Sequence, residues 1–139
     1  MLYDFFLKNF LIFIILIFII IFLIVIELFY AKKFKNAIQV RDVLKYMNYD
    51  KAVIFDLRSE SDYQNCHILD SINLPIDKVN KNHTLVKKYK NKTIILICNN
   101  NYESLKALKA FKVLINYNVF YLDGGFKSWL KESMPTTSL

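Results

Sequence analysis

The sequence predicts a small α/β domain with a mostly parallel sheet flanked by helices, preceded by one N-terminal transmembrane helix. Three observations support this fold class. An apolar run continues from Phe10 to Ile26 without a polar residue. After residue 38, short apolar runs alternate with segments whose apolar residues recur at helical spacing, as in a parallel α/β sheet. The runs at 52–57 and 93–98 are mostly apolar, which is typical of parallel strands buried on both faces.

The N-terminal apolar block has the length of a membrane span. A helix over residues 10–30 rises about 1.5 Å per residue and is therefore roughly 30 Å long, the thickness of the hydrocarbon layer. Its only charged residue is Glu27. A cleaved signal peptide would have a shorter apolar region, a more basic start and a small-residue cleavage site. The sequence therefore favours an uncleaved anchor at 10–30, after a tail at 1–9 and before a basic linker at 31–37.

The basic residues around this block are distributed asymmetrically. The N-terminal side carries Lys8, whereas the C-terminal side carries Lys32, Lys33, Lys35 and Arg41. By the positive-inside rule, this asymmetry predicts an N-terminus outside the cell and a cytoplasmic domain after the span. The predicted partner of the block is the lipid bilayer, and the flanking lysines can also attract anionic headgroups.

The composition argues against two other classes. The net charge is +7, but a nucleic-acid surface needs a basic stripe with exposed aromatic side chains. The lysines at positions 106, 109 and 112 share one helix face, which is typical of a solvated surface, so no nucleic-acid partner is predicted. Two cysteines in a domain expected to face the cytoplasm do not indicate a disulfide scaffold.

The predicted domain spans residues 38–135 and is followed by a short tail at 136–139. Its two glycines, Gly124 and Gly125, are the only ones in the chain, which indicates a turn that needs positive φ or a close backbone approach. Trp129 is the expected packing anchor of the last helix. The predicted elements are, in order, a helix at 38–47, a strand at 52–57, a helical turn at 59–66, a strand at 71–74, a weak helix at 85–89, a strand at 93–98, a helix at 103–115, a strand at 119–122 and a helix at 126–132.

Three segments, in order, resemble the rhodanese-like domain family. The first, VIFDLRSESDYQNCHILDSINLP at 53–75, is similar to the family's Asp-x-Arg, acid plus aromatic, Gly-His-Ile and Asn before Pro. The second, TIILICNNNYESLKAL at 93–108, is similar to its active-site strand, cysteine loop and helix. The third, VFYLDGGFKSWLKESMP at 119–135, resembles its closing strand, Gly-Gly, Trp and terminal Pro. One N-terminal span before a single such domain also resembles the membrane-anchored rhodaneses of bacteria, which implies the inner membrane as the location.

The resemblance implies a sulfurtransferase that carries sulfane sulfur as a persulfide on Cys98, at the carboxyl end of a parallel strand. Asp56 and Arg58 match the family's Asp-x-Arg, which helps to hold the active-site loop. No cofactor is implied, and the partners would be sulfur-donor or sulfur-acceptor proteins. A cradle of backbone N–H groups is expected around the thiolate, with Ser104 capping the next helix. The cradle residues would be Asn99, Asn100, Asn101, Tyr102, Glu103 and Ser104.

Two cradle residues depart from the pattern of active members, which usually have Gly at the position of Asn101 and Arg at the position of Glu103. Asparagine tolerates left-handed geometry better than most residues, so Asn101 is compatible with a curled loop. The Glu103 carboxylate makes a thiolate costlier, repels thiosulfate and competes for the helix N-terminus. Two functions therefore stay open. One is a sulfurtransferase acting through Cys98, and the other is a catalytically silent binding module whose partners are other membrane or peripheral proteins.

Two further activities are disfavoured. Phosphatases built on the rhodanese fold clamp phosphate with an Arg, and no Arg follows Cys98 in this chain. The chain's two cysteines and two histidines could in principle bind zinc, but the spacing of Cys66, His67, His83 and Cys98 matches no common zinc module. No metal is therefore predicted, and His67 is expected to hydrogen-bond within its own loop.

Overall fold

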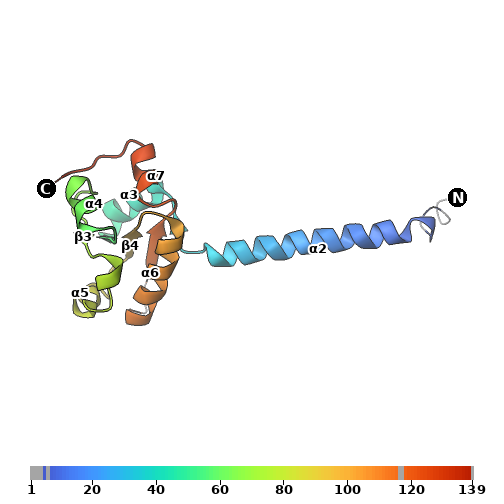
Figure 1. The fold of residues 1–139 in the computed structure, drawn as a ribbon, viewed down its shortest axis with the longest axis horizontal. Coiled ribbons are helices and arrows are strands. Elements are labelled where there is room, and N and C mark those ends of the chain that lie inside the picture. Colours follow the sequence, from blue (N-terminus) through green and yellow to red (C-terminus); the bar gives the residue numbers. More distant parts are fainter. Residues whose placement is uncertain (1–4, 6, 116–117, 139) are drawn as a thin grey trace. The chain divides into compact units, whose positions relative to one another are not determined.

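The structure is a computed structural model that describes residues 5, 7–115 and 118–138. The chain divides into two compact units, Met1–Lys35 and Asn36–Leu139. Figure 1 shows a long helix in the first unit and a layered α/β domain in the second.

The long helix of the first unit, α2, runs over Phe10–Lys33. Its apolar side chains between Phe10 and Tyr30 point outward on every side of the helix. Its segment Phe10–Lys32 has a mean hydropathy of 3.6 and is long and apolar enough to cross a membrane. A helix that is apolar all round needs an apolar surrounding, so this unit has the character expected of the predicted span. The helix continues three residues beyond the predicted end at residue 30 because Ala31, Lys32 and Lys33 keep its hydrogen-bonding pattern.

The second unit is built on a five-stranded parallel sheet in the order β1-β5-β4-β2-β3. The central strand, β4, is buried at every residue, because helices cover both faces of a parallel sheet. This burial explains the nearly unbroken apolar run that predicted the strand. The strands are β1 at Ala37–Ile38, β2 at Val53–Asp56, β3 at Ile72–Asn73, β4 at Ile94–Ile97 and β5 at Val119–Leu122.

Helices lie on the two faces of the sheet, with α3 and α7 on one side and α5 and α6 on the other (Figure 1). The first face is filled by a cluster that includes Val43, Ile95 and Trp129. On the second face, the Phe55 ring contacts the Phe111 ring at a centroid distance of 5.6 Å. The helices are α3 at Val40–Tyr49, α4 at Glu60–Asn65, α5 at His83–Lys88, α6 at Asn101–Leu114 and α7 at Phe126–Lys131, with a 3₁₀ turn, η1, at Ile76–Lys78.

One local prediction was wrong, and one confirmed helix begins two residues earlier than expected. Ala37 and Ile38 were expected in the linker and at a helix start, but they form β1, because the edge of β5 offers them a parallel partner. The helix expected at 103–115 begins at Asn101, because the Asn100 side chain accepts a hydrogen bond from the Glu103 N–H at 3.0 Å and caps it there.

We expect Trp129→Ala to lower the free energy of unfolding by roughly 3–5 kcal/mol, because the indole is 1% exposed and its loss leaves a cavity. The change also removes the hydrogen bond from the indole N–H to the Pro135 carbonyl at 3.0 Å. Urea denaturation of the detergent-solubilised full chain, followed by far-UV circular dichroism, measures the change.

The neighbouring residue Leu130 is the matched control, because it lies on the same helix with 49% of its surface exposed. Leu130→Ala should shift the unfolding midpoint very little. Equal losses in the two variants would contradict the proposed core of this face.

Candidate active site

The candidate site lies at the carboxyl edge of the parallel sheet. Cys98 directly follows β4, and Asp56 is the last residue of β2. Asp123, Gly124 and Gly125 follow β5, the other neighbour of β4. Because the carboxyl ends of neighbouring parallel strands meet at one edge, residues far apart in the sequence come together here, which is where open α/β sheets place their sites.

The Cys98 side chain is buried at this edge, with 1% of its surface exposed. Burial raises the pKa of the thiol from 9.0 to about 12; the neighbouring Ser104 hydroxyl opposes that rise, and the carboxylates of Glu103 and Asp56 add to it. The Ser104 hydroxyl donates its one proton to the Asn100 carbonyl at 3.0 Å. Little donor capacity therefore stays available for a thiolate, and the protonated thiol is the stable form at neutral pH.

Glu103 folds back over the loop that follows Cys98. Its carboxylate accepts a hydrogen bond from the Asn99 N–H at 3.4 Å and one from the Asn100 side-chain amide at 3.2 Å. The predicted competition for the N–H groups of the loop is therefore present in the structure. One backbone N–H group and one side-chain amide of the loop are thus bonded to a carboxylate of the protein.

The other cradle residues differ in their exposure. Asn99, Asn100 and Tyr102 are exposed, with Tyr102 at 80%. Ser104, which was expected to cap the helix, lies in its first turn, because Asn100 takes the cap position. Only Asn99 and Asn100 separate Cys98 from α6, so the backbone has little length with which to encircle an anion.

Asn101 has helical geometry, so the left-handed conformation that asparagine tolerates is not used at this position. Its side chain instead joins the two loops of the site. The amide nitrogen donates to Asp123 Oδ1 at 2.6 Å, and the amide oxygen accepts from the Gly124 N–H at 2.8 Å. A glycine at this position would give the backbone more conformational freedom. Asn101 instead links α6 to the turn after β5 through these two hydrogen bonds.

Gly125 allows that turn to touch the end of β4. With φ at 66°, a Cβ on this residue would lie 2.2 Å from the Cys98 carbonyl oxygen. The next residue, Phe126, donates its N–H to the same oxygen at 2.9 Å. The prediction that the paired glycines serve positive φ and close backbone approach is confirmed.

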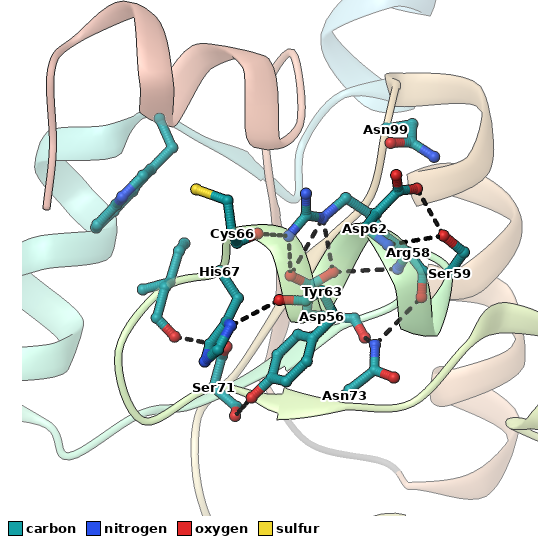
Figure 2. A network of polar contacts seen from close by, with 12 residues as sticks. Asp56, Arg58, Ser59, Asp62, Tyr63, Cys66, His67, Ser71, Asn73 and Asn99 are labelled. Atoms are coloured by element: carbon teal, nitrogen blue, oxygen red, sulfur yellow. Dashed lines mark hydrogen bonds and ion pairs between the residues drawn. The ribbon is translucent and has the colours of Figure 1, made fainter. Parts of the chain in front are cut away.

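Arg58 and Asp56 form a buried ion pair, with a distance of 2.6 Å between Arg58 Nη2 and Asp56 Oδ2 (Figure 2). The same nitrogen donates to the Cys66 carbonyl at 2.7 Å. The guanidinium lies 3.5 Å from the centre of the Phe126 ring. Arg58 thus reaches the Cys98 loop through Phe126, because within the described part of the chain none of its hydrogen bonds goes to residues 99–104.

A second group of polar residues fixes the loop around α4. His67 Nδ1 lies 2.7 Å from the Tyr63 carbonyl, as expected for a hydrogen bond within its loop, and the two rings stack. The Tyr63 hydroxyl donates to the Ser71 carbonyl, and the Asn73 amide donates to the Asp56 carbonyl at 3.1 Å (Figure 2). In the part of the chain that the structure describes, no group of three or more potential metal ligands comes together.

Sequence reasoning missed three contributors to the site: Asn73, Asp123 and Phe126. Asn73 was read as part of a family motif without a role. Asp123 and Phe126 flank the glycine pair. The glycines indicated a close backbone contact, but the sequence did not show which segment of the chain makes that contact. The bonds from Asn101 and Phe126 to these loops span more than twenty residues of sequence, so local patterns do not reveal them.

The fold and this edge define a class of protein: a small parallel α/β domain with a cysteine between its central strand and an amphipathic helix. A model of the Rhodanese-like domain family matches residues 39–132. The chain belongs to the rhodanese-like domain family.

Several bacterial proteins are similar to this chain in sequence, and those described here are uncharacterized. An uncharacterized protein of Buchnera aphidicola subsp. Baizongia pistaciae (strain Bp) is 31% identical over 106 residues, covering 73% of this chain and 72% of the relative. The uncharacterized protein YibN of Escherichia coli (strain K12) is 27% identical over 95 residues, covering 68% of this chain and 66% of the relative.

Solved structures show the same fold. The BH2092 protein of Bacillus halodurans aligns with a TM-score of 0.68 at 28% identity, over 81% of this chain and 83% of that one. A thiosulfate sulfurtransferase of Pseudomonas aeruginosa aligns with a TM-score of 0.65 at 17% identity, over 74% of this chain but 19% of the larger protein. At that identity, the second likeness concerns the fold alone.

We expect Arg58→Met to lower the free energy of unfolding by roughly 3–5 kcal/mol, because it leaves the fully buried Asp56 carboxylate without its cation. Adding Asp56→Asn to this variant should recover part of the loss, since the unpaired charge is then gone. Urea denaturation of the solubilised full chain measures both variants.

Arg41 provides a matched control, because it is the chain's other arginine and is exposed. Arg41→Met should leave the unfolding midpoint almost unchanged. If Arg58→Met behaved in the same way, the buried ion pair would not be the support of this edge.

Proposed function

We propose that this protein is a membrane-tethered binding module, built on a rhodanese-like domain whose sulfur-transfer site is closed. One observation carries the proposal. The Cys98 thiol is buried, and the Glu103 carboxylate takes the N–H group of the loop beside it.

Sulfur transfer through a persulfide requires a thiolate that can reach its donor. The thiolate attacks the outer sulfur of a donor such as thiosulfate, the S–S bond of the donor breaks, and sulfite leaves with the electron pair. With a thiol pKa of about 12, only about one Cys98 in 10⁵ is ionised at pH 7. The persulfide anion would also need donors that Glu103 already occupies. The raised pKa of the thiol and the hydrogen bonds to Glu103 both oppose catalysis.

A sulfurtransferase at Cys98 is the second candidate. Its support is the place of the cysteine after the central strand, together with the Ser104 hydroxyl, which opposes the rise in the thiol's pKa. This candidate requires Glu103 to move away from Asn99 and water to reach the thiol. It predicts a persulfide on Cys98, which the module does not.

The closed loop still presents groups that a protein partner can use. Asn99, Asn100 and Tyr102 project from the carboxyl edge, and the cross-links through Asn101 and Glu103 hold them in place. Rigid polar groups beside an exposed tyrosine lose little entropy on binding. These residues would form the contact surface for another membrane or peripheral protein.

The tether in this proposal is α2, as a single pass through a bacterial inner membrane. The basic residues after the helix support an N-terminus outside the cell and a cytoplasmic domain. The resulting protein would display a preformed loop at the membrane without turning over a substrate.

After incubation with thiosulfate, we expect no gain of one sulfur atom, about 32 Da, in intact-mass spectra of the wild-type chain. Glu103→Arg should raise the alkylation rate of Cys98 at pH 7 by roughly tenfold, because a cation stabilises the neighbouring thiolate. In the wild type, that rate should increase about tenfold per pH unit through the alkaline range, since the raised pKa lies near 12.

Two variants complete this experiment. Glu103→Gln removes the negative charge without adding a positive one and should give a smaller increase, while Cys98→Ser identifies the modified residue. A wild-type mass gain that disappears in Cys98→Ser would overturn the binding module and favour the sulfurtransferase. Equal alkylation rates in wild type and Glu103→Arg would refute the inhibitory role of Glu103.

For the membrane orientation, we expect green fluorescent protein fused to the C-terminus to fluoresce and alkaline phosphatase fused there to be inactive, because the first folds in the cytoplasm and the second does not. Whole-cell fluorescence and phosphatase assays measure the two fusions.

Moving the basic residues is the control for this orientation. Changing Lys32, Lys33 and Lys35 to Gln and adding three lysines before Phe10 should reverse the pattern, since the basic flank sets the orientation. An active phosphatase fusion to the unchanged chain would contradict the proposed topology.

A further inference from the structure

A second surface of the domain lies at the opposite edge of the sheet, where the parallel strands begin. Lys51 precedes β2 by two residues, and Lys92 precedes β4 by two. The Val53 N–H donates to the Thr93 carbonyl at 2.9 Å, so these two strand starts lie side by side.

Helix ends add further lysines to this edge. Lys87 and Lys88 end α5, and Lys90 follows them; Lys87 and Lys90 line a hollow of about 420 Å³ together with Leu114 and Ile115 at the end of α6. In the last turn of α6, Lys112 Nζ donates to Asn36 Oδ1 at 3.0 Å. We call the resulting set the basic edge: Lys51, Lys87, Lys88, Lys90, Lys92 and Lys112.

The charges of the basic edge are exposed and unpaired. All six lysines are exposed, and the ion pairs of the described residues are those of Arg58 with Asp56 and of Lys78 with Glu60. Asp50 is the acidic residue next to Lys51 at the end of α3. Six positive charges against one negative charge leave a strong local excess, which attracts an anionic surface.

Two side chains close to these lysines in the sequence are highly exposed. Tyr49, the last residue of α3, is 81% exposed, and Val113, next to Lys112, is 86% exposed. Lysines next to an exposed tyrosine and an exposed aliphatic residue suit the interfacial layer of a membrane. There the lysines can contact the headgroups, while the tyrosine and the aliphatic side chain contact the upper part of the acyl chains.

The chain itself limits how far this edge can be from a membrane. Residues 34–36 join α2 to β1, so the start of β1 lies at most about 14 Å from the end of α2 along the chain. Asn36 also donates to the carbonyl of Val119, the first residue of β5, at 2.8 Å, which fixes the junction close to the strand starts. Only a short piece of chain therefore separates α2 from the edge at which the strands begin.

We propose that the basic edge binds the surface of an anionic phospholipid membrane. The lysines contact headgroup phosphates, and Tyr49 and Val113 enter the interfacial layer. This inference rests on the proposed tethering by α2, but it does not depend on whether Cys98 is reactive. Contact at the starts of the strands leaves the opposite, carboxyl edge free for a partner.

Hydrogen exchange of the full chain in lipid nanodiscs tests this proposal. Amides at 87–93 should exchange at least about threefold more slowly in nanodiscs of phosphatidylcholine with about one-third phosphatidylglycerol than in phosphatidylcholine alone, because anionic lipid attracts the lysines. The difference should disappear at about 0.5 M salt, where the charges are screened. Amides at 99–104, on the opposite edge, should exchange equally in both lipids.

Two variants with the same loss of charge separate this edge from a general charge effect. Lys87→Gln, Lys88→Gln, Lys90→Gln and Lys92→Gln together should abolish the slowing. The matched control replaces four lysines from elsewhere on the domain surface and should retain it: Lys78→Gln, Lys81→Gln, Lys106→Gln and Lys127→Gln.

The possible failures are distinguishable. Equal exchange in both lipids, in a chain that has entered the nanodiscs, overturns the basic edge and leaves the tether in place. Loss of slowing in the control variant also overturns it, because net charge alone would then explain the effect. A chain that does not enter the nanodiscs overturns the tether and this proposal together, while the persulfide measurement decides the role of Cys98 independently.

Discussion

The site depends on a contact between two backbone segments: the turn after β5 rests directly on the end of β4. The Phe126 N–H binds the Cys98 carbonyl, and Gly125 leaves no room for a Cβ between them. The Phe126 ring then carries the Arg58 guanidinium, which is held by Asp56. Three strands are thus joined at their carboxyl ends by one hydrogen bond, one cation–π contact and one buried ion pair. None of these three interactions involves the Cys98 sulfur, so this arrangement does not depend on catalysis at that atom.

The two departures from the family pattern act together on the loop. Asn101 ties the start of α6 to the turn after β5, and Glu103 ties the same turn of the helix back to Asn99. With both in place, the Asn99 and Glu103 N–H groups have side-chain acceptors within the loop. Preorganised donors assist catalysis only when they are directed at the reacting group. Here the loop is ordered by hydrogen bonds from these N–H groups to side chains of the same loop. This arrangement favours a fixed surface over a cradle that binds an anion.

The order of the elements and the burial of β4 could be predicted because both follow from local periodicity. The close approach of the glycines and the Arg58–Asp56 pair were also accessible, because each is encoded by neighbouring residues. β1 was missed because two residues carry no periodicity and owe their conformation to the edge of β5. The cap at Asn100 was missed because three consecutive asparagines are locally equivalent, and only the position of Glu103 in the folded loop distinguishes them. The long-range bonds of Asn101 lie beyond any local pattern.

The two edges of the sheet differ in how their charges are balanced. At the carboxyl edge, the Asp56 and Arg58 charges are buried and paired, so they support the fold and offer little to a ligand. At the opposite edge, lysines lie next to the C-terminal ends of α5 and α6. Their positive charges stabilise the negative ends of the helix dipoles, while their ammonium groups stay in solvent. The same residues can therefore stabilise the domain and attract an anionic surface without a conformational change. Under the proposed function, a closed cysteine site still leaves this fold a use, because presenting a rigid loop needs only the sheet, the tether and the charged edge.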